Sequence, residues 1–187
     1  MIVINQASPS FAVFLQKARQ LDLSPIAYQL MQSEAGPRWT RAKTVKAIAQ
    51  YLAFLYLIDR YSHLSLVPSL EIDQVWHYHI LDTRKYAEDC QLLFDCMIHH
   101  FPYLGLRGVQ DRRSQSKAYA ITQILFTKHF DGNSIGQNSL PGDCEPIRLR
   151  ATSDNRDYFD ALHLQARPQV ALDIQEVLVN MPVSSVS

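Results

Sequence analysis

The chain has 187 residues, of which 47% are hydrophobic and 19% charged, values typical of a folded protein with its own core. Its 18 Lys and Arg residues balance its 18 Asp and Glu residues, so no overall positive field favours nucleic acid, and RNA binding is the weakest of the candidate functions. The sequence starts without the order of a signal peptide and its longest apolar run, residues 51–58, is too short for a membrane span, so we expect a cytoplasmic protein.

Helical periodicity dominates the first 130 residues. Apolar residues recur every three or four positions over residues 8–23, 40–61 and 109–130, and a short helix is expected after Ser24. The pattern over 40–61 has Thr40 as a candidate N-cap and is apolar on nearly every side, which is typical of a central helix.

Two further helices are predicted in the middle of the chain. Ser69 is placed to cap a helix over residues 70–81, and Asp82 a helix over residues 83–100 that ends before Pro102. Gly105 and Gly108 then suit a turn with positive φ. The expected fold is mainly α, a compact bundle of about five to six helices with an irregular C-terminal segment.

The composition changes after residue 130. Residues 131–146 are rich in Gly, Pro, Asn and Ser, which indicates a loop; residues 147–151 alternate as a strand does, and residues 168–180 suit a helix begun by Pro168. We therefore predict a helical domain over 1–130, which carries the WHxH and HHFPY motifs, and an irregular extension over 131–187 that can pack on the same domain.

The stretch "DQVWHYHILD", residues 73–82, combines histidines, carboxylates and aromatic rings. On a helix, His77 and His79 point about 200° apart and cannot easily hold one ion together. Asp73 and His77 share a face, which suits a carboxylate that orients an imidazole. His79 instead shares its face with residues expected in the core, namely Ile72, Val75 and Trp76.

The predicted helix over 83–100 adds further candidate ligands. It places Asp89, Cys96 and His100 on one side, with Tyr86 and Cys90 one turn apart. Imidazole, thiolate and carboxylate are ligands of Zn²⁺ and Fe²⁺. The chain has no HExxH, and its three cysteines form no CxxC pair, so the spacing alone favours reduced thiols and structural histidines.

Two longer segments resemble a known family. "DQVWHYHILDTRKYAEDC" and "IHHFPYLGLRG" are similar to the signature region of the glycine-rich domain-containing protein-like family, over about residues 40–144. The positions that match are Asp73, Trp76, His77, His79, Asp82, Tyr86, Asp89, Cys90, His99, His100, Pro102 and Tyr103. The resemblance implies no particular reaction. Longer plant relatives carry a glycine-rich tail, whereas this chain has six glycines, so a role of that tail does not carry over.

Two hypotheses remain open, so the sequence does not decide whether the protein is an enzyme. In the first, a polar pocket binds a divalent transition metal such as Zn or Fe, or a small ligand, through Asp73, His77, His79, Asp89, Cys90 and His100. In the second, the chain is a non-enzymatic interaction or scaffold module with a protein partner, whose histidines only satisfy buried polar groups. Six residues support the motif in either case: Trp76, Asp82, Tyr86, His99, Pro102 and Tyr103.

Overall fold

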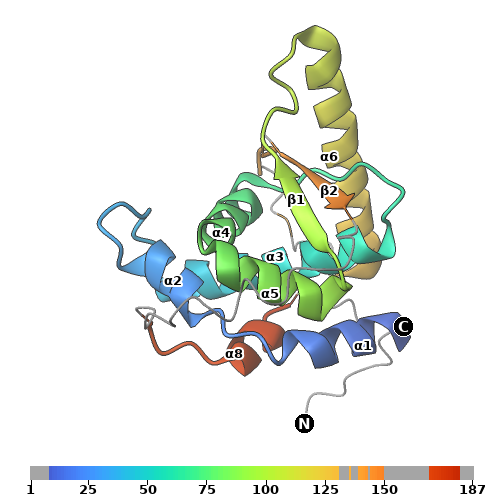
Figure 1. Cartoon of the computed structure of the whole chain (residues 1–187). Helices are drawn as coiled ribbons and strands as arrows, with labels where there is room; N and C mark the ends of the chain where they lie inside the picture. Colours follow the sequence, from blue (N-terminus) through green and yellow to red (C-terminus); the bar gives the residue numbers. More distant parts are fainter. Residues whose placement is uncertain (1–8, 131–134, 136–138, 143, 150–168, 182–187) are drawn as a thin grey trace.

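A long buried helix, α3 (Arg41–Arg60), forms the centre of the computed structural model (Figure 1). Every residue from Thr44 to Ile58 except Lys46 is buried, so α3 is covered on all sides, as its sequence predicts. The predicted cap is confirmed: the Thr40 hydroxyl accepts a hydrogen bond from the Lys43 N–H. The helices that pack against α3 are α1 (Pro9–Ala18), α2 (Ser24–Met31), α4 (Leu70–Leu81), α6 (Val109–His129) and α8 (Ile174–Val179).

The structure describes residues 9–130, 135, 139–142, 144–149 and 169–181. These residues form seven helices and two short strands, which confirms the mainly α fold. Within them, no helix has the length and apolar character that crossing a lipid bilayer requires.

Helices α4 and α5 (Thr83–Phe94) form a corner. Ser69 caps α4 by accepting a hydrogen bond from the Ile72 N–H, and the Asp82 carboxylate caps α5 by accepting one from the Lys85 N–H. Both caps were predicted, because an oxygen on a short side chain there pairs with a backbone N–H that has no partner inside the helix.

The predicted helix over 83–100 is wrong beyond Phe94. Asp95 takes the left-handed conformation, with φ 56° and ψ 20°, and Met97–Phe101 forms strand β1. β1 pairs antiparallel with β2 (Glu145–Leu149), and this distant partner supplies the hydrogen bonds that a longer helix would have made internally. Cys96 and His100 therefore do not share a helical face with Asp89.

Among the described residues after position 130, the chain forms a strand and a helix. β2 begins two residues before the predicted strand, and α8 begins at Ile174, where the Asp173 side chain caps it. Val177 of α8 is fully buried and the helix packs on α3. The predicted helix over 168–180 is wrong before Ile174, because residues 169–173 are not helical; Pro168 itself lies outside the described residues. The division of the chain at residue 130 stays a prediction.

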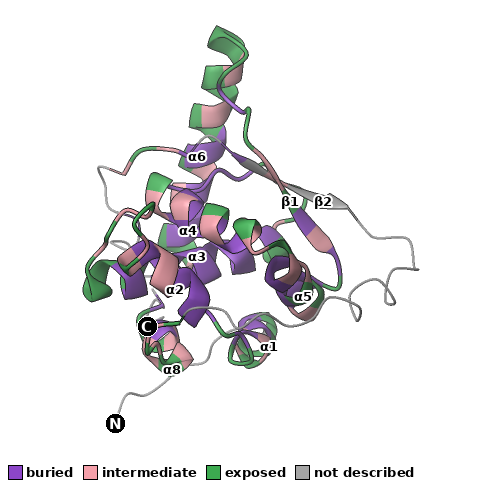
Figure 2. Cartoon of the chain, turned by 60° about the vertical axis from the view of Figure 1, so that its left-hand side comes forward, coloured by how far each residue is buried: buried purple, intermediate pink, exposed green. Residues whose placement is uncertain are grey.

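Helix α6 follows a tight turn and stands away from the body. Gly105 and Gly108 have φ values of 90° and 104°, as predicted for this turn. The buried residues of α6 begin at Ala118, so its first turns rise above the rest of the molecule, where Figure 2 shows them mostly exposed.

Candidate functional site

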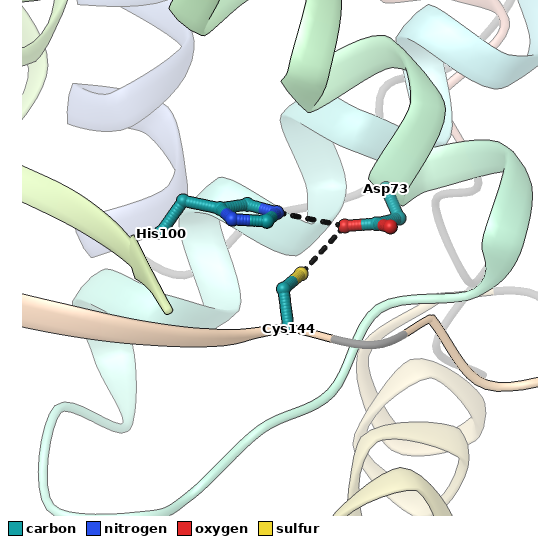
Figure 3. A group of neighbouring side chains, drawn as sticks. All are labelled: Asp73, His100 and Cys144. Atoms are coloured by element: carbon teal, nitrogen blue, oxygen red, sulfur yellow. Dashed lines mark hydrogen bonds and ion pairs between the residues drawn. The ribbon is translucent and has the colours of Figure 1, made fainter. Parts of the chain in front are cut away.

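Three polar side chains meet where α4, β1 and the chain just before β2 come together (Figure 3). Asp73 lies between the other two: its Oδ1 is 3.0 Å from Nε2 of His100 and 2.6 Å from Sγ of Cys144. One ligand atom from each residue lies within 4.8 Å of the other two. Asp73 and Cys144 are buried, and the His100 side chain is 7% exposed. We call these three residues the Asp-His-Cys cluster.

The first turn of α4 fixes Asp73. Its N–H donates to the Ser69 carbonyl oxygen at 2.8 Å, as part of the capped start of the helix. Its side chain packs against Gly142, where an added Cβ would lie 2.8 Å from Cβ of Asp73 and 3.0 Å from its Cγ. Glycine at 142 therefore lets the segment that carries Cys144 approach the carboxylate closely.

Backbone hydrogen bonds hold Cys144 in place from its N-terminal side. The Leu70 N–H donates to the Leu140 carbonyl at 3.0 Å, and the Gly142 N–H donates to the Pro68 carbonyl at 2.8 Å. On its C-terminal side, the chain enters β2 directly. Cys144 thus sits between two segments whose positions are set by pairing with α4 and β1.

His77 lies on the solvent side of the cluster. Its Nδ1 is 2.8 Å from the Asp73 carbonyl oxygen and 3.5 Å from Oδ2 of the same residue, so the two residues share a face as predicted, but the backbone carbonyl and not the carboxylate makes the closer contact with the imidazole. Because a carbonyl oxygen only accepts, Nδ1 of His77 donates this hydrogen bond. The ring centroid is 4.4 Å from that of His100, and the His77 side chain is 51% exposed.

The order of the three groups decides which chemistry they suit. In a thiol-imidazole-carboxylate relay the imidazole contacts the thiol and takes its proton. Here the carboxylate stands in the middle and accepts from both neighbours, so His100 is not placed to activate Cys144. A thiolate, an imidazole and a carboxylate that face one point are instead a ligand set for Zn²⁺ or Fe²⁺.

His79 belongs to a different, fully buried network. Its Nε2 is 2.8 Å from Oδ2 of Asp89, and its Nδ1 is 2.9 Å from the Tyr51 hydroxyl. Lys85 Nζ lies 2.9 Å from the same Asp89 oxygen. Burial lowers the pKa of His79, although the hydrogen bond to Asp89 opposes that shift. Neutral His79 can donate to the carboxylate and accept from Tyr51, so both ring nitrogens have partners inside the core.

Trp76 and Tyr86 link α4 and α5 to β1. The Trp76 Nε1–H donates to the Tyr86 hydroxyl at 2.8 Å, and that hydroxyl donates to the Ile98 carbonyl at 2.5 Å. All three residues are buried, and burial raises the pKa of Tyr86. The predicted core positions of α4 are confirmed, and the network fixes the strand that carries His100.

The other motif residues lie away from the cluster or serve the fold. Cys90 is buried, which raises the pKa of its thiol to about 11, so the thiol stays protonated at neutral pH. Asp82 is the cap of α5. His99 points to solvent on β1, next to the nearly buried side chain of His100, and the remaining two motif residues are exposed in the following turn, Pro102 and Tyr103.

The structure thus divides the predicted ligand set. It brings Asp73, His77 and His100 together and places His79 with Asp89 elsewhere. Cys144 was not among the predicted ligands, because its contact with Asp73 spans 71 residues of sequence. The one signal for it was that the family resemblance extended as far as residue 144.

Comparisons with known proteins agree with that resemblance. The chain is 30% identical over 105 residues to glycine-rich domain-containing protein 2 of Arabidopsis thaliana, which covers 50% of the chain and 13% of the relative. It is 31% identical over 97 residues to glycine-rich domain-containing protein 1 of the same plant, with 46% and 12% covered. The chain therefore matches only about one-eighth of the length of these relatives. No solved structure matches it.

A family model places the site within a known group of sequences. The model, described as UCP032817-like, matches residues 25–131, more than half of the chain. This segment contains the motif residues of α4, α5 and β1, among them Asp73 and His100, whereas Cys144 lies beyond it. The chain belongs to the UCP032817-like family.

Proposed function

We propose that the Asp-His-Cys cluster binds a divalent transition-metal ion, Zn²⁺ or Fe²⁺. The observation that carries the proposal is the convergence of three ligand atoms of different elements within 4.8 Å, from residues 73, 100 and 144. Side chains so far apart in sequence meet only through the tertiary fold.

The donor distances fit an exchange of protons for a metal ion. A tetrahedral zinc ion holds its ligand atoms about 3.2 to 3.6 Å apart. The oxygen of Asp73 lies 3.0 Å from the imidazole nitrogen and 2.6 Å from the thiol sulfur, both below this range. Entry of a metal would remove the thiol proton and would need the lone pair on Nε2 of His100, so a proton on that atom would move to Nδ1 or, from an imidazolium, be released. The ligand atoms would also move apart by about 0.2 to 1 Å.

Three protein ligands leave room for a further ligand. Catalytic zinc sites use three side chains and keep a fourth position for water or substrate, whereas structural sites close all four. The half-exposed His77 marks the direction from which a small ligand could arrive. We therefore propose a metal centre that binds a small ligand, with His77 at its entrance.

A scaffold role is the alternative, and one observation favours it. Oδ1 of Asp73 already accepts hydrogen bonds from both neighbours, so the three groups satisfy one another without an ion. His79 shows the same behaviour in the core, where both of its nitrogens are paired. In this case the cluster would stabilise the contact between α4 and the β1–β2 pair, and the function would lie in a protein partner.

Elemental analysis of the untagged protein, as purified and after addition of Zn²⁺ or Fe²⁺ under reducing conditions, distinguishes the two. We expect close to one metal ion per chain in the wild type, and background levels in His100→Gln and in Cys144→Ser. The matched controls are His99→Gln, which changes the exposed neighbour on β1, and Cys96→Ser, which changes another buried thiol.

The outcome assigns the cluster to one role or the other. Metal that is lost in the two cluster variants and kept in the two controls, with circular dichroism unchanged in all four, supports the metal centre. A wild type that stays metal-free after repletion, or controls that lose as much metal as the cluster variants, would exclude it and favour the scaffold role.

A further inference from the structure

Helix α6 carries an excess of basic residues in a chain whose net charge is zero. The 21 residues of α6 include Arg112, Arg113, Lys117 and Lys128 but a single acidic residue, Asp111. That carboxylate is already occupied, because Arg107 pairs with it at 2.9 Å. Within the described residues, no acidic side chain pairs with the first three of these cations. The exposed side of α6 is therefore basic.

Large apolar side chains are exposed at the N-terminal end of the same helix and in the turn before it. Tyr103, Leu106 and Val109 are 57%, 62% and 68% exposed, all within seven residues of chain. They lie at the start of α6, which projects from the body of the molecule (Figures 1 and 2). Arg112 and Arg113 follow Val109 by three and four positions, so they share its side of the helix. We call Tyr103, Leu106, Val109, Arg112, Arg113 and Lys117 the α6 tip.

The turn that presents these apolar groups is held in one shape. The Asp111 carboxylate accepts hydrogen bonds from the N–H groups of Gly105, at 2.7 Å, and Arg107, at 3.1 Å. Leu104 faces inward, in a small core cluster with three other residues: Val67, Ala118 and Tyr119. Leu104 is thus buried while Leu106, two positions on, is directed outward by a fixed backbone.

We propose that the α6 tip docks on an anionic membrane surface. Exposed aliphatic and aromatic side chains can enter the boundary between head groups and acyl chains, while the adjacent cations pair with anionic lipids. The positive end of the α6 dipole lies at the same place and adds to the attraction. The α6 tip combines both requirements at a projecting end that can reach a surface before the rest of the molecule.

Nucleic acid would use the cations but not the aliphatic groups. Affinity for a phosphate backbone comes from Lys and Arg, and single-stranded bases stack on aromatic rings. Leu106 and Val109 contribute to neither interaction, yet they are the two most exposed large apolar side chains of the α6 tip. They favour a lipid surface as the partner.

Sedimentation with vesicles tests the proposal. The probes are vesicles of phosphatidylcholine with 30% phosphatidylserine and vesicles of phosphatidylcholine alone. We expect the full chain to bind the anionic vesicles and Arg112→Glu/Arg113→Glu to bind them at least about 25-fold more weakly, from about fivefold per cation. Leu106→Ser/Val109→Ser keeps the charge and should weaken binding at least about tenfold.

Matched controls keep the test specific to the α6 tip. Arg19→Glu/Lys46→Glu makes the same change of net charge at exposed positions elsewhere, and Val13→Ser/Leu81→Ser removes two other exposed apolar groups. Both controls should bind as the wild type does, with circular dichroism unchanged in all four variants.

Other results would overturn the proposal. One is equal sedimentation of the wild type with anionic and with neutral vesicles, and another is a loss of binding in the controls as large as in the tip variants. A third is binding of a single-stranded RNA oligonucleotide in the absence of vesicle binding. If Arg112→Glu/Arg113→Glu abolishes this RNA binding and Leu106→Ser/Val109→Ser leaves it unchanged, the surface binds nucleic acid instead.

Discussion

The Tyr86 hydroxyl joins three elements, and its removal has a calculable effect. It accepts from Trp76 Nε1–H at 2.8 Å and donates to the Ile98 carbonyl at 2.5 Å, with all three residues buried. Tyr86→Phe keeps the ring but leaves an indole N–H and a carbonyl without this partner. An unpaired buried group costs about 1 to 3 kcal/mol, so we expect a loss of about 3 kcal/mol in the free energy of unfolding.

Urea denaturation followed by circular dichroism measures this loss, and thermal melting should show a midpoint lower by about 6 to 12 °C. Tyr103→Phe is the matched control, because Tyr103 is 57% exposed and should change stability by less than about 0.5 kcal/mol. The double variant Trp76→Phe/Tyr86→Phe also removes the indole N–H that Tyr86→Phe leaves unpaired. The free energy of unfolding that it loses should therefore be smaller than the sum of the losses in the two single variants. A loss below about 1 kcal/mol in Tyr86→Phe would contradict this prediction, since the indole N–H and the Ile98 carbonyl would then have other partners.

Two more predictions concern the cluster and the core. Gly142→Ala places a Cβ 2.8 Å from Cβ of Asp73, so we expect a loss of about 1 to 3 kcal/mol in unfolding free energy and at least about tenfold weaker zinc binding in a competition titration. Gly36→Ala is the control, because its Cβ would lie 2.1 Å from the Gln29 carbonyl oxygen, so it should destabilise the fold without changing zinc affinity. Equal loss of zinc binding in both variants would contradict the prediction. Burial lowers the pKa of His79 in the folded protein below its value of about 6.5 in the unfolded chain. Between the two pKa values the imidazole is protonated only in the unfolded state, so the free energy of unfolding falls as the pH drops below about 6.5. His79→Gln should remove up to about 1.4 kcal/mol per pH unit of that slope in urea denaturation between pH 7.5 and 5, and an unchanged slope would show that His79 does not titrate differently in the two states.

The sequence predicted those features that depend on neighbouring residues. Thr40, Ser69 and Asp82 act as caps within three positions of their partners, so the starts of α3, α4 and α5 could be read directly. The core face of α4 and the positive φ of the turn before α6 were predictable for the same reason, because periodicity and glycine act locally.

The strand β1 and the position of Cys144 depend on distant residues and could not be predicted in that way. The helical pattern continues past Phe94, but Asp95 tolerates the left-handed conformation and β2 offers hydrogen bonds to residues 97–101. Burial alternates from Ile98 to His100, as in a strand, yet such a short stretch does not outweigh a helical pattern of twelve residues in α5. The position of Cys144 then follows from β2, since the two are adjacent in the chain.

The separation of the three cluster residues along the chain has a consequence for folding. Asp73 meets His100 by closing a loop of 27 residues and meets Cys144 by closing one of 71. The longer closure costs about 0.9 kcal/mol more entropy, from a dependence of (3/2)RT ln n on loop length. We expect the carboxylate and the imidazole to meet first and the thiol to join when β2 adds to β1. A metal ion bound before Cys144 arrives would have only oxygen and nitrogen ligands. Pairing of β2 with β1 would then add the sulfur ligand, which favours metals that prefer sulfur.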